Sequence, residues 1–144
     1  MKSVTQTIQE IGKIGSVILV VPHLQRPSVM MRSWCIWELL SAIHSPFEYS
    51  FAVALTPTAQ RTLETQLVRN FDRLLHAVTA VDSECSVANN PEEQELLRSA
   101  IISHCRGSYQ YADGELTKLL ENWFGQTAYT ALVELGIDTH RPTK

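Results

Sequence analysis

Residue types that can take part in chemistry gather at one place in the sequence. Ser33, Trp34, Cys35 and Glu38 lie within six consecutive positions, and Trp37 stands directly before the acid. Tryptophan and cysteine are usually buried, so a carboxylate among them loses hydration that a partner or a ligand must replace. This combination marks Glu38 as the residue on which a functional site would centre.

The elements around this acid would place it near the carboxyl end of a strand. Residues 16–21 are almost all apolar, which predicts a strand covered on both faces in the middle of a parallel sheet. Prolines keep the following loop, residues 22–28, from being helical, and a helix is predicted over residues 31–45. Open α/β sheets bind ligands beyond the carboxyl ends of their strands, so His23 and Arg26 are candidate contacts for a phosphate or ribose. A solvated loop without a ligand is the alternative.

The strand and the helix start together resemble a known family. An apolar strand over residues 17–21, a loop, and then serine, tryptophan and cysteine followed three positions later by glutamate resemble the third strand and following helix of TIR (Toll/interleukin-1 receptor) domains. The second tryptophan makes the segment more similar to the TIR-like domains of large uncharacterised algal and protist proteins. The resemblance spans about residues 4–125 and is sharpest over residues 16–40.

This resemblance implies an α/β fold of the flavodoxin-like kind, in which helices flank a parallel sheet. The matching segment begins at the third strand, so the chain would hold a remnant of that sheet, incomplete on its N-terminal side, and a helix-rich C-terminal half. A second strand is predicted over residues 49–55, parallel to the first because a helix joins them. Two parallel strands are not expected to stand alone. The chain is therefore a fragment, takes further strands from a partner, or has become mostly helical.

The resemblance implies association as the first function and NAD hydrolysis as the alternative. TIR domains commonly self-assemble or dock to other TIR surfaces, and an incomplete sheet gives this chain a physical reason to bind a protein partner or a second copy. In TIR domains that hydrolyse NAD, the glutamate that matches Glu38 is catalytic, and Trp34 and Ser33 would support substrate binding. A carboxylate there would stabilise the positive charge that develops on the ribose as nicotinamide leaves. A structural subunit of a larger assembly is a further alternative.

A purely structural interpretation of the same residues stays open. Trp34, Cys35 and Trp37 would then pack the helix on the sheet, with Glu38 exposed or paired with Arg32. The loops and glycine-rich features that complete a TIR nucleotide pocket have no counterpart in residues 1–15. Without them, a single glutamate would hold little of a dinucleotide.

Composition limits the kinds of partner. The chain has 144 residues, 44% of them hydrophobic, which suits one domain over residues 1–136 and a loose tail over residues 137–144. A net charge of −3 without a basic cluster argues against nucleic acid as a partner. No apolar run reaches the length that spans a bilayer, and the N-terminus lacks a signal-peptide core. We therefore expect an intracellular, cytoplasmic protein without membrane insertion.

Neither a metal nor a bound cofactor is predicted. The three cysteines are widely spaced, which favours reduced thiols over a disulfide framework and does not fit a zinc knuckle. The five histidines are scattered and form no pair at metal-ligand spacing. NAD therefore enters only as a candidate substrate.

Capping residues and apolar stripes predict the remaining helices. A threonine–proline pair and an asparagine–proline pair followed by two acids mark two helix starts, and glycines mark helix ends. The first dozen residues predict a further short amphipathic helix. The other predicted helices cover about residues 57–79, 91–107 and 113–135, while residues 79–88 fit either a loop or a short third strand.

Overall fold

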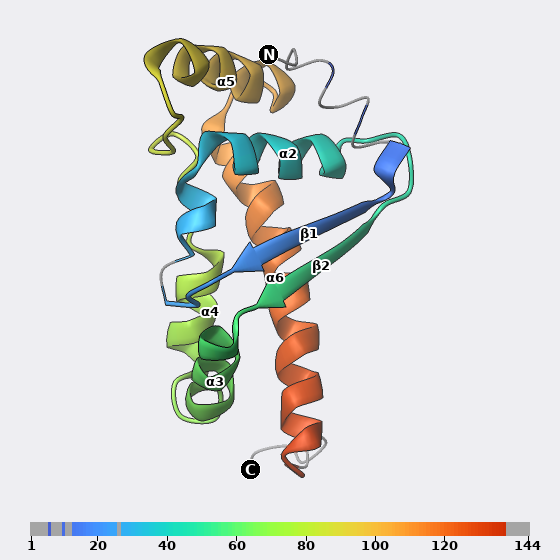
Figure 1. Cartoon of the computed structure of the whole chain (residues 1–144), viewed down its shortest axis with the longest axis vertical. Helices are drawn as coiled ribbons and strands as arrows, with labels where there is room; N and C mark the ends of the chain where they lie inside the picture. Colours follow the sequence, from blue (N-terminus) through green and yellow to red (C-terminus); the bar gives the residue numbers. More distant parts are fainter. Residues whose placement is uncertain (1–5, 7–9, 11–12, 26, 138–144) are drawn as a thin grey trace.

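The computed structural model describes residues 6, 10, 13–25 and 27–137, and this part of the chain forms a mixed α/β domain (Figure 1). The helix predicted over the first dozen residues lies almost entirely outside the described residues, as does the predicted tail beyond residue 137. The elements in chain order are β1 (Ser16–Val21), the 3-10 helix η1 (Ser28–Met31), α2 (Ser33–Ile43), β2 (Ser50–Leu55), α3 (Pro57–Gln66), α4 (Phe71–Thr79), α5 (Pro91–His104) and α6 (Tyr109–Glu134).

The two predicted strands form a parallel pair, which confirms that part of the prediction. β1 and β2 run in register from Ser16 opposite Ser50 to Val21 opposite Leu55. They make a two-stranded sheet, so each strand has one edge without a partner strand among the described residues. Helix α2 joins them and packs mainly against η1, α5 and α6. The described chain thus contains a parallel pair within a largely helical structure.

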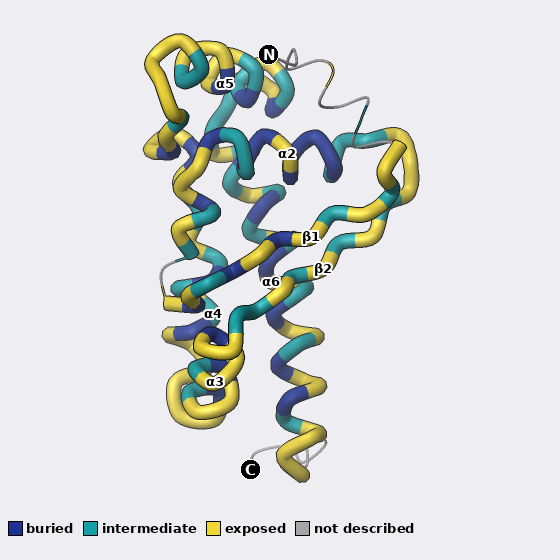
Figure 2. Tube along the Cα trace, in the orientation of Figure 1, coloured by how far each residue is buried: buried dark blue, intermediate teal, exposed yellow. Residues whose placement is uncertain are grey.

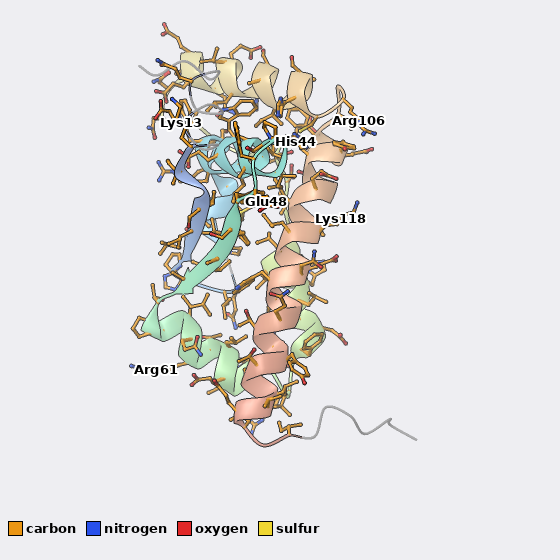
Figure 3. All side chains as sticks on the ribbon, turned by 90° about the vertical axis from the view of Figure 1, so that its right-hand side faces the viewer. Lys13, His44, Glu48, Arg61, Arg106 and Lys118 are labelled. Atoms are coloured by element: carbon orange, nitrogen blue, oxygen red, sulfur yellow. The ribbon has the colours of Figure 1, made fainter. Side chains whose placement is uncertain are left out.

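The prediction that β1 is covered on both faces is wrong. Leu19 and Val21 are buried at 5% and 4% exposure, whereas Ile18 and Val20 are 62% and 57% exposed. Successive side chains of a strand point to opposite faces, so this alternation means that one face packs inward and the other meets solvent. Helix α6 runs along one side of the sheet in both views, and no described element covers the other side (Figures 1 and 3).

The single helix predicted over residues 57–79 is two helices, α3 and α4. Its start is as predicted, because the Thr56 hydroxyl accepts a hydrogen bond from the Ala59 amide at 3.3 Å and donates one to the Pro22 carbonyl at 2.8 Å. The chain leaves the helical path at Asn70, whose amide still bonds the Gln66 carbonyl at 2.8 Å. An apolar stripe does not reveal this break, since the buried positions on both sides keep helical spacing.

The start of α5 is confirmed, and α6 begins earlier than predicted. The Asn90 side-chain oxygen accepts a hydrogen bond from the Glu93 amide at 2.9 Å, with Pro91 in the first turn. Helix α6 begins at Tyr109 rather than near residue 113, because the Ser108 hydroxyl accepts from the Tyr111 amide at 3.3 Å. Gly107, at a φ of 77°, provides the left-handed conformation that separates the two helices. Residues 79–88 form a connection whose strand-like pairing is one isolated bridge between Arg32 and Val87.

Helix α6 provides the centre of the hydrophobic core. Its buried residues recur at spacings of three and four, so a single stripe of the helix faces inward along its length (Figure 2). Helices α2, α4 and α5 pack against this helix. The α6 stripe consists of Ala112, Leu116, Leu120, Phe124, Ala128 and Ala131. Leu96, which the apolar pattern of residues 91–107 places on the buried face of that helix, is instead 43% exposed.

Candidate functional site

Ser33, a predicted substrate-binding residue, belongs to a buried hydrogen-bond network. Its hydroxyl lies 2.9 Å from the hydroxyl of Ser86, and both side chains are almost completely inaccessible to solvent. The Gln94 amide nitrogen donates to the Ser33 hydroxyl at 3.3 Å and to the Ser86 carbonyl at 2.9 Å. The Gln94 carbonyl oxygen also accepts from the Ala88 amide. This network joins the start of α2 to the first turns of α5 through the 79–88 connection.

Trp34 and Cys35, on the turn that follows, are half-buried. The Trp34 indole nitrogen donates to a carboxylate oxygen of Glu93 at 3.5 Å, which joins α2 to the start of α5. Desolvation raises the pKa of the Cys35 thiol, and the negative charge of Glu38 adds to this shift. A raised thiol pKa keeps the sulfur protonated near neutral pH, so the site does not make Cys35 a nucleophile.

Glu38, the predicted catalytic residue, is exposed on α2. Partial desolvation raises the pKa of its carboxyl group, and the positive charge of Arg32 opposes this shift. Among the described residues, Glu38 forms no hydrogen bond and no ion pair within 4.0 Å. The Glu38 carboxylate therefore faces solvent. Arg32 is close enough to affect it electrostatically but lies beyond ion-pair distance.

The structure does not bring the loop after β1 to Glu38. His23 is exposed in this loop, and Arg26 lies outside the described residues. The loop lies at the end of the sheet nearest α3 and α4, and η1 leads the chain away from it before α2 begins (Figure 1). The geometric reason is the 3-10 helix over Ser28–Met31, which lies between the loop and α2 and was not predicted from the sequence.

A pocket of about 530 Å³ lies where this loop, η1 and α4 meet, and sequence reasoning missed it. Gln25 and Pro27 of the loop contribute to its wall, so the predicted ligand loop does line a cavity, although His23, Ser33, Trp34 and Glu38 do not. Arg73 and His76 of α4 add polar groups one helical turn apart. That spacing on the polar face of a predicted helix was the available signal.

The far wall of this pocket holds a carboxylate and a thiol. Asp82 and Cys85 both line it, and the Cys85 amide donates to an Asp82 carboxylate oxygen at 3.0 Å. A hydrogen bond to Asp82 and the charge of that group raise the pKa of the Cys85 thiol. The pocket is therefore suited to binding rather than to thiolate chemistry.

A second polar cluster lies where the end of α2 meets α5 and α6. The His44 and His104 rings are 4.8 Å apart, and the His44 Nε2 atom is 3.8 Å from a carboxylate oxygen of Glu115 (Figure 3). The Trp37 ring meets the His104 ring edge-on at 5.4 Å. The His104 Nε2 and Trp37 Nε1 atoms are both buried without a hydrogen-bond partner among the described residues. Desolvation, with a smaller contribution from His44, lowers the pKa of His104.

We expect His104 to make the protein less stable as the pH falls. Its pKa is lower in the folded state than the ordinary 6.5 of the unfolded chain, so between these two values the unfolded state binds more protons. The free energy of unfolding should therefore decrease as the pH drops below about 6.5, by at most about 1.4 kcal/mol per pH unit from this group. Urea unfolding between neutral pH and pH 5 measures the slope.

His104→Phe should flatten that slope, while His76→Phe, which alters an exposed histidine of α4, should not. Trp37 and His44 contact the His104 ring, Glu115 and Tyr111 contact His44, and all four are retained in the variant. An unchanged slope in His104→Phe would contradict this assignment.

In the part of the chain that the structure describes, no group of three or more histidine, cysteine, aspartate or glutamate side chains is placed to hold a metal ion. None of the described helices combines the length and the apolar composition needed to cross a bilayer. Comparison with known proteins adds no family: no family model, no curated protein and no solved structure matches the chain.

Proposed function

We propose that this chain is a protein-association module and that it associates through the open face of its two-stranded sheet. The observation that carries the proposal is the exposure of Ile18 and Val20, at 62% and 57%, at the centre of a face that no described element covers. Exposed β-branched apolar side chains at alternate positions of a strand lie side by side on one face, and such a surface gains by being covered.

The partner that this face fits best is a second copy of the chain. Neither strand contains a charged residue, and Ala52 and Ala54 of β2 extend the exposed face beside Ile18 and Val20. A neutral apolar face meets no like-charge repulsion when two identical copies pack against each other, so it is compatible with an isologous dimer. Each strand also has one unpaired edge among the described residues, and such edges recruit further strands.

The proposal is tested by the mass of the protein in solution. We expect the wild-type chain to sediment as a dimer at micromolar concentration, and Ile18→Lys/Val20→Lys to sediment as a monomer. The two lysines would have to bury opposing positive charges at the contact, whereas they are solvated on the free surface. The matched control is Val68→Lys, which alters a residue of similar exposure, 61%, between α3 and α4.

Circular dichroism should show the same secondary structure in all three proteins. A wild-type protein that stays monomeric over the accessible concentration range would overturn the proposal, as would a double-lysine variant that still dimerises.

We also propose that β1, α2 and β2 correspond to part of the flavodoxin-like sheet of a TIR-like domain. The parallel pairing through α2, together with serine, tryptophan and cysteine at the start of that helix, supports this relation. Association is the function that such a relation implies. The alternative, NAD hydrolysis through Glu38, has less support, because the acid is exposed and does not line the pocket to which the β1 loop contributes.

A further inference from the structure

We propose that the pocket behind the β1 loop binds a small amphipathic carboxylate, a molecule with one anionic head and an apolar body. This inference does not rest on the association proposed above, because the pocket is built from the β1 loop, η1 and α4 rather than from the open face of the sheet.

The walls of the pocket suit an apolar body. Met30, at 3% exposure, forms part of its base, and Met31, Pro27, Ala77 and Ala80 line the space around it. Methionine side chains adapt to apolar shapes without a fixed partner. A volume of about 530 Å³ is within the range in which proteins bind small molecules.

The polar head would lie at Arg73. A smaller adjoining pocket of about 180 Å³ shares Gln25, Arg73 and Ala77 with the larger one and adds the amides of Gln66 and Asn70. Arg73 thus borders both an apolar space and a polar one, and it forms no ion pair or hydrogen bond with any described residue. An unpaired guanidinium beside an apolar wall binds a carboxylate through two parallel hydrogen bonds.

The charges of the described lining residues favour a ligand with a single negative charge. Arg73 is the one residue with a permanent positive charge among the described residues that line either pocket. Asp82 lies on the wall of the larger pocket, so a second anionic group at that end of a ligand would be repelled. A monocarboxylate with an alkyl or aryl body satisfies both conditions.

Titration of decanoate and of decanol into the full chain measures the contribution of the anionic head separately from that of the apolar body. We expect decanoate to bind about tenfold more tightly than decanol, since a charge-assisted hydrogen-bonded pair is worth roughly that factor. Nuclear magnetic resonance should place the shifted amides at Met30, Met31 and Ala77. Arg73→Gln should remove the preference for decanoate, while Arg61→Gln should keep it. Arg61 is exposed on α3, lines neither pocket and points outward (Figure 3).

A substitution that fills the larger pocket tests whether the apolar body of the ligand binds there. Ala80→Trp places an indole at the rim of the larger pocket just after α4, where the backbone is exposed, and should weaken both ligands about tenfold or more. Equal affinity of the wild-type protein for decanoate and decanol, or no binding of either, would overturn the proposal without any variant. An Arg73→Gln protein that keeps the preference for decanoate would do the same.

Discussion

Trp37→Ala is expected to lower the free energy of unfolding by about 3–5 kcal/mol, the range measured when a large buried aromatic is truncated. Trp37 is 2% exposed, lies on the buried face of α2 and contacts the His104 ring. Its removal would leave a cavity between α2, α5 and α6 that a fully packed helix junction cannot close. Guanidinium unfolding followed by circular dichroism measures the change.

Glu38→Ala, one position further along α2, is the matched control and should change stability by less than about 0.5 kcal/mol, because this side chain is exposed. Trp37→Phe should cost less than Trp37→Ala, since phenylalanine keeps most of the apolar volume and removes an indole N–H that has no partner among the described residues. Similar losses for Trp37→Ala and Glu38→Ala would show that the helix start is not organised around the buried tryptophan.

Gln94→Leu is the second substitution with a large expected effect, about 2–4 kcal/mol of lost stability. The Gln94 amide bonds the Ala88 amide, the Ser86 carbonyl and the Ser33 hydroxyl, so leucine would leave backbone groups of the 79–88 connection without partners. Each buried polar group left unsatisfied costs about 1–3 kcal/mol. Hydrogen exchange at Val87 and Ala88 should accelerate together with the loss of stability.

Gln126→Leu provides the comparison, because Gln126 is exposed on α6 and its side chain makes no hydrogen bond to a described residue. We expect it to change neither the free energy of unfolding by more than about 0.5 kcal/mol nor the exchange of the 79–88 amides. If Gln94→Leu changes stability and amide exchange as little as Gln126→Leu does, the hydrogen bonds of Gln94 do not hold the 79–88 connection in place.

Local chemistry explains which parts of the fold could be predicted. The parallel strands and the starts of α3 and α5 follow from apolar runs and from capping residues whose hydrogen bonds span only three positions. The prediction that β1 is buried on both faces was wrong. An apolar strand sequence does not show whether helices cover one face of the strand or both. The break at Asn70 was equally invisible, since Leu67, directly after α3, and Leu74 of α4 both face the core.

The candidate sites were harder to predict because they depend on contacts distant in sequence. Ser33 appeared as a ligand contact from its neighbours, yet its partners Ser86 and Gln94 lie more than fifty positions away. The pocket combines the β1 loop with Arg73 of α4, and no spacing within either segment shows that they meet. The pattern of residues within one segment indicates whether that segment is a helix or a strand. A cavity depends on how several segments are arranged in space, which no single pattern shows.

The position of α6 has a consequence for the order in which the chain can acquire structure during synthesis. Helices α2, α4 and α5 pack against α6, which is the final element in the chain order. The segments made before α6 therefore lack their common packing partner until α6 has been synthesised. Until α6 is available, the apolar sides of these segments stay exposed to non-specific association.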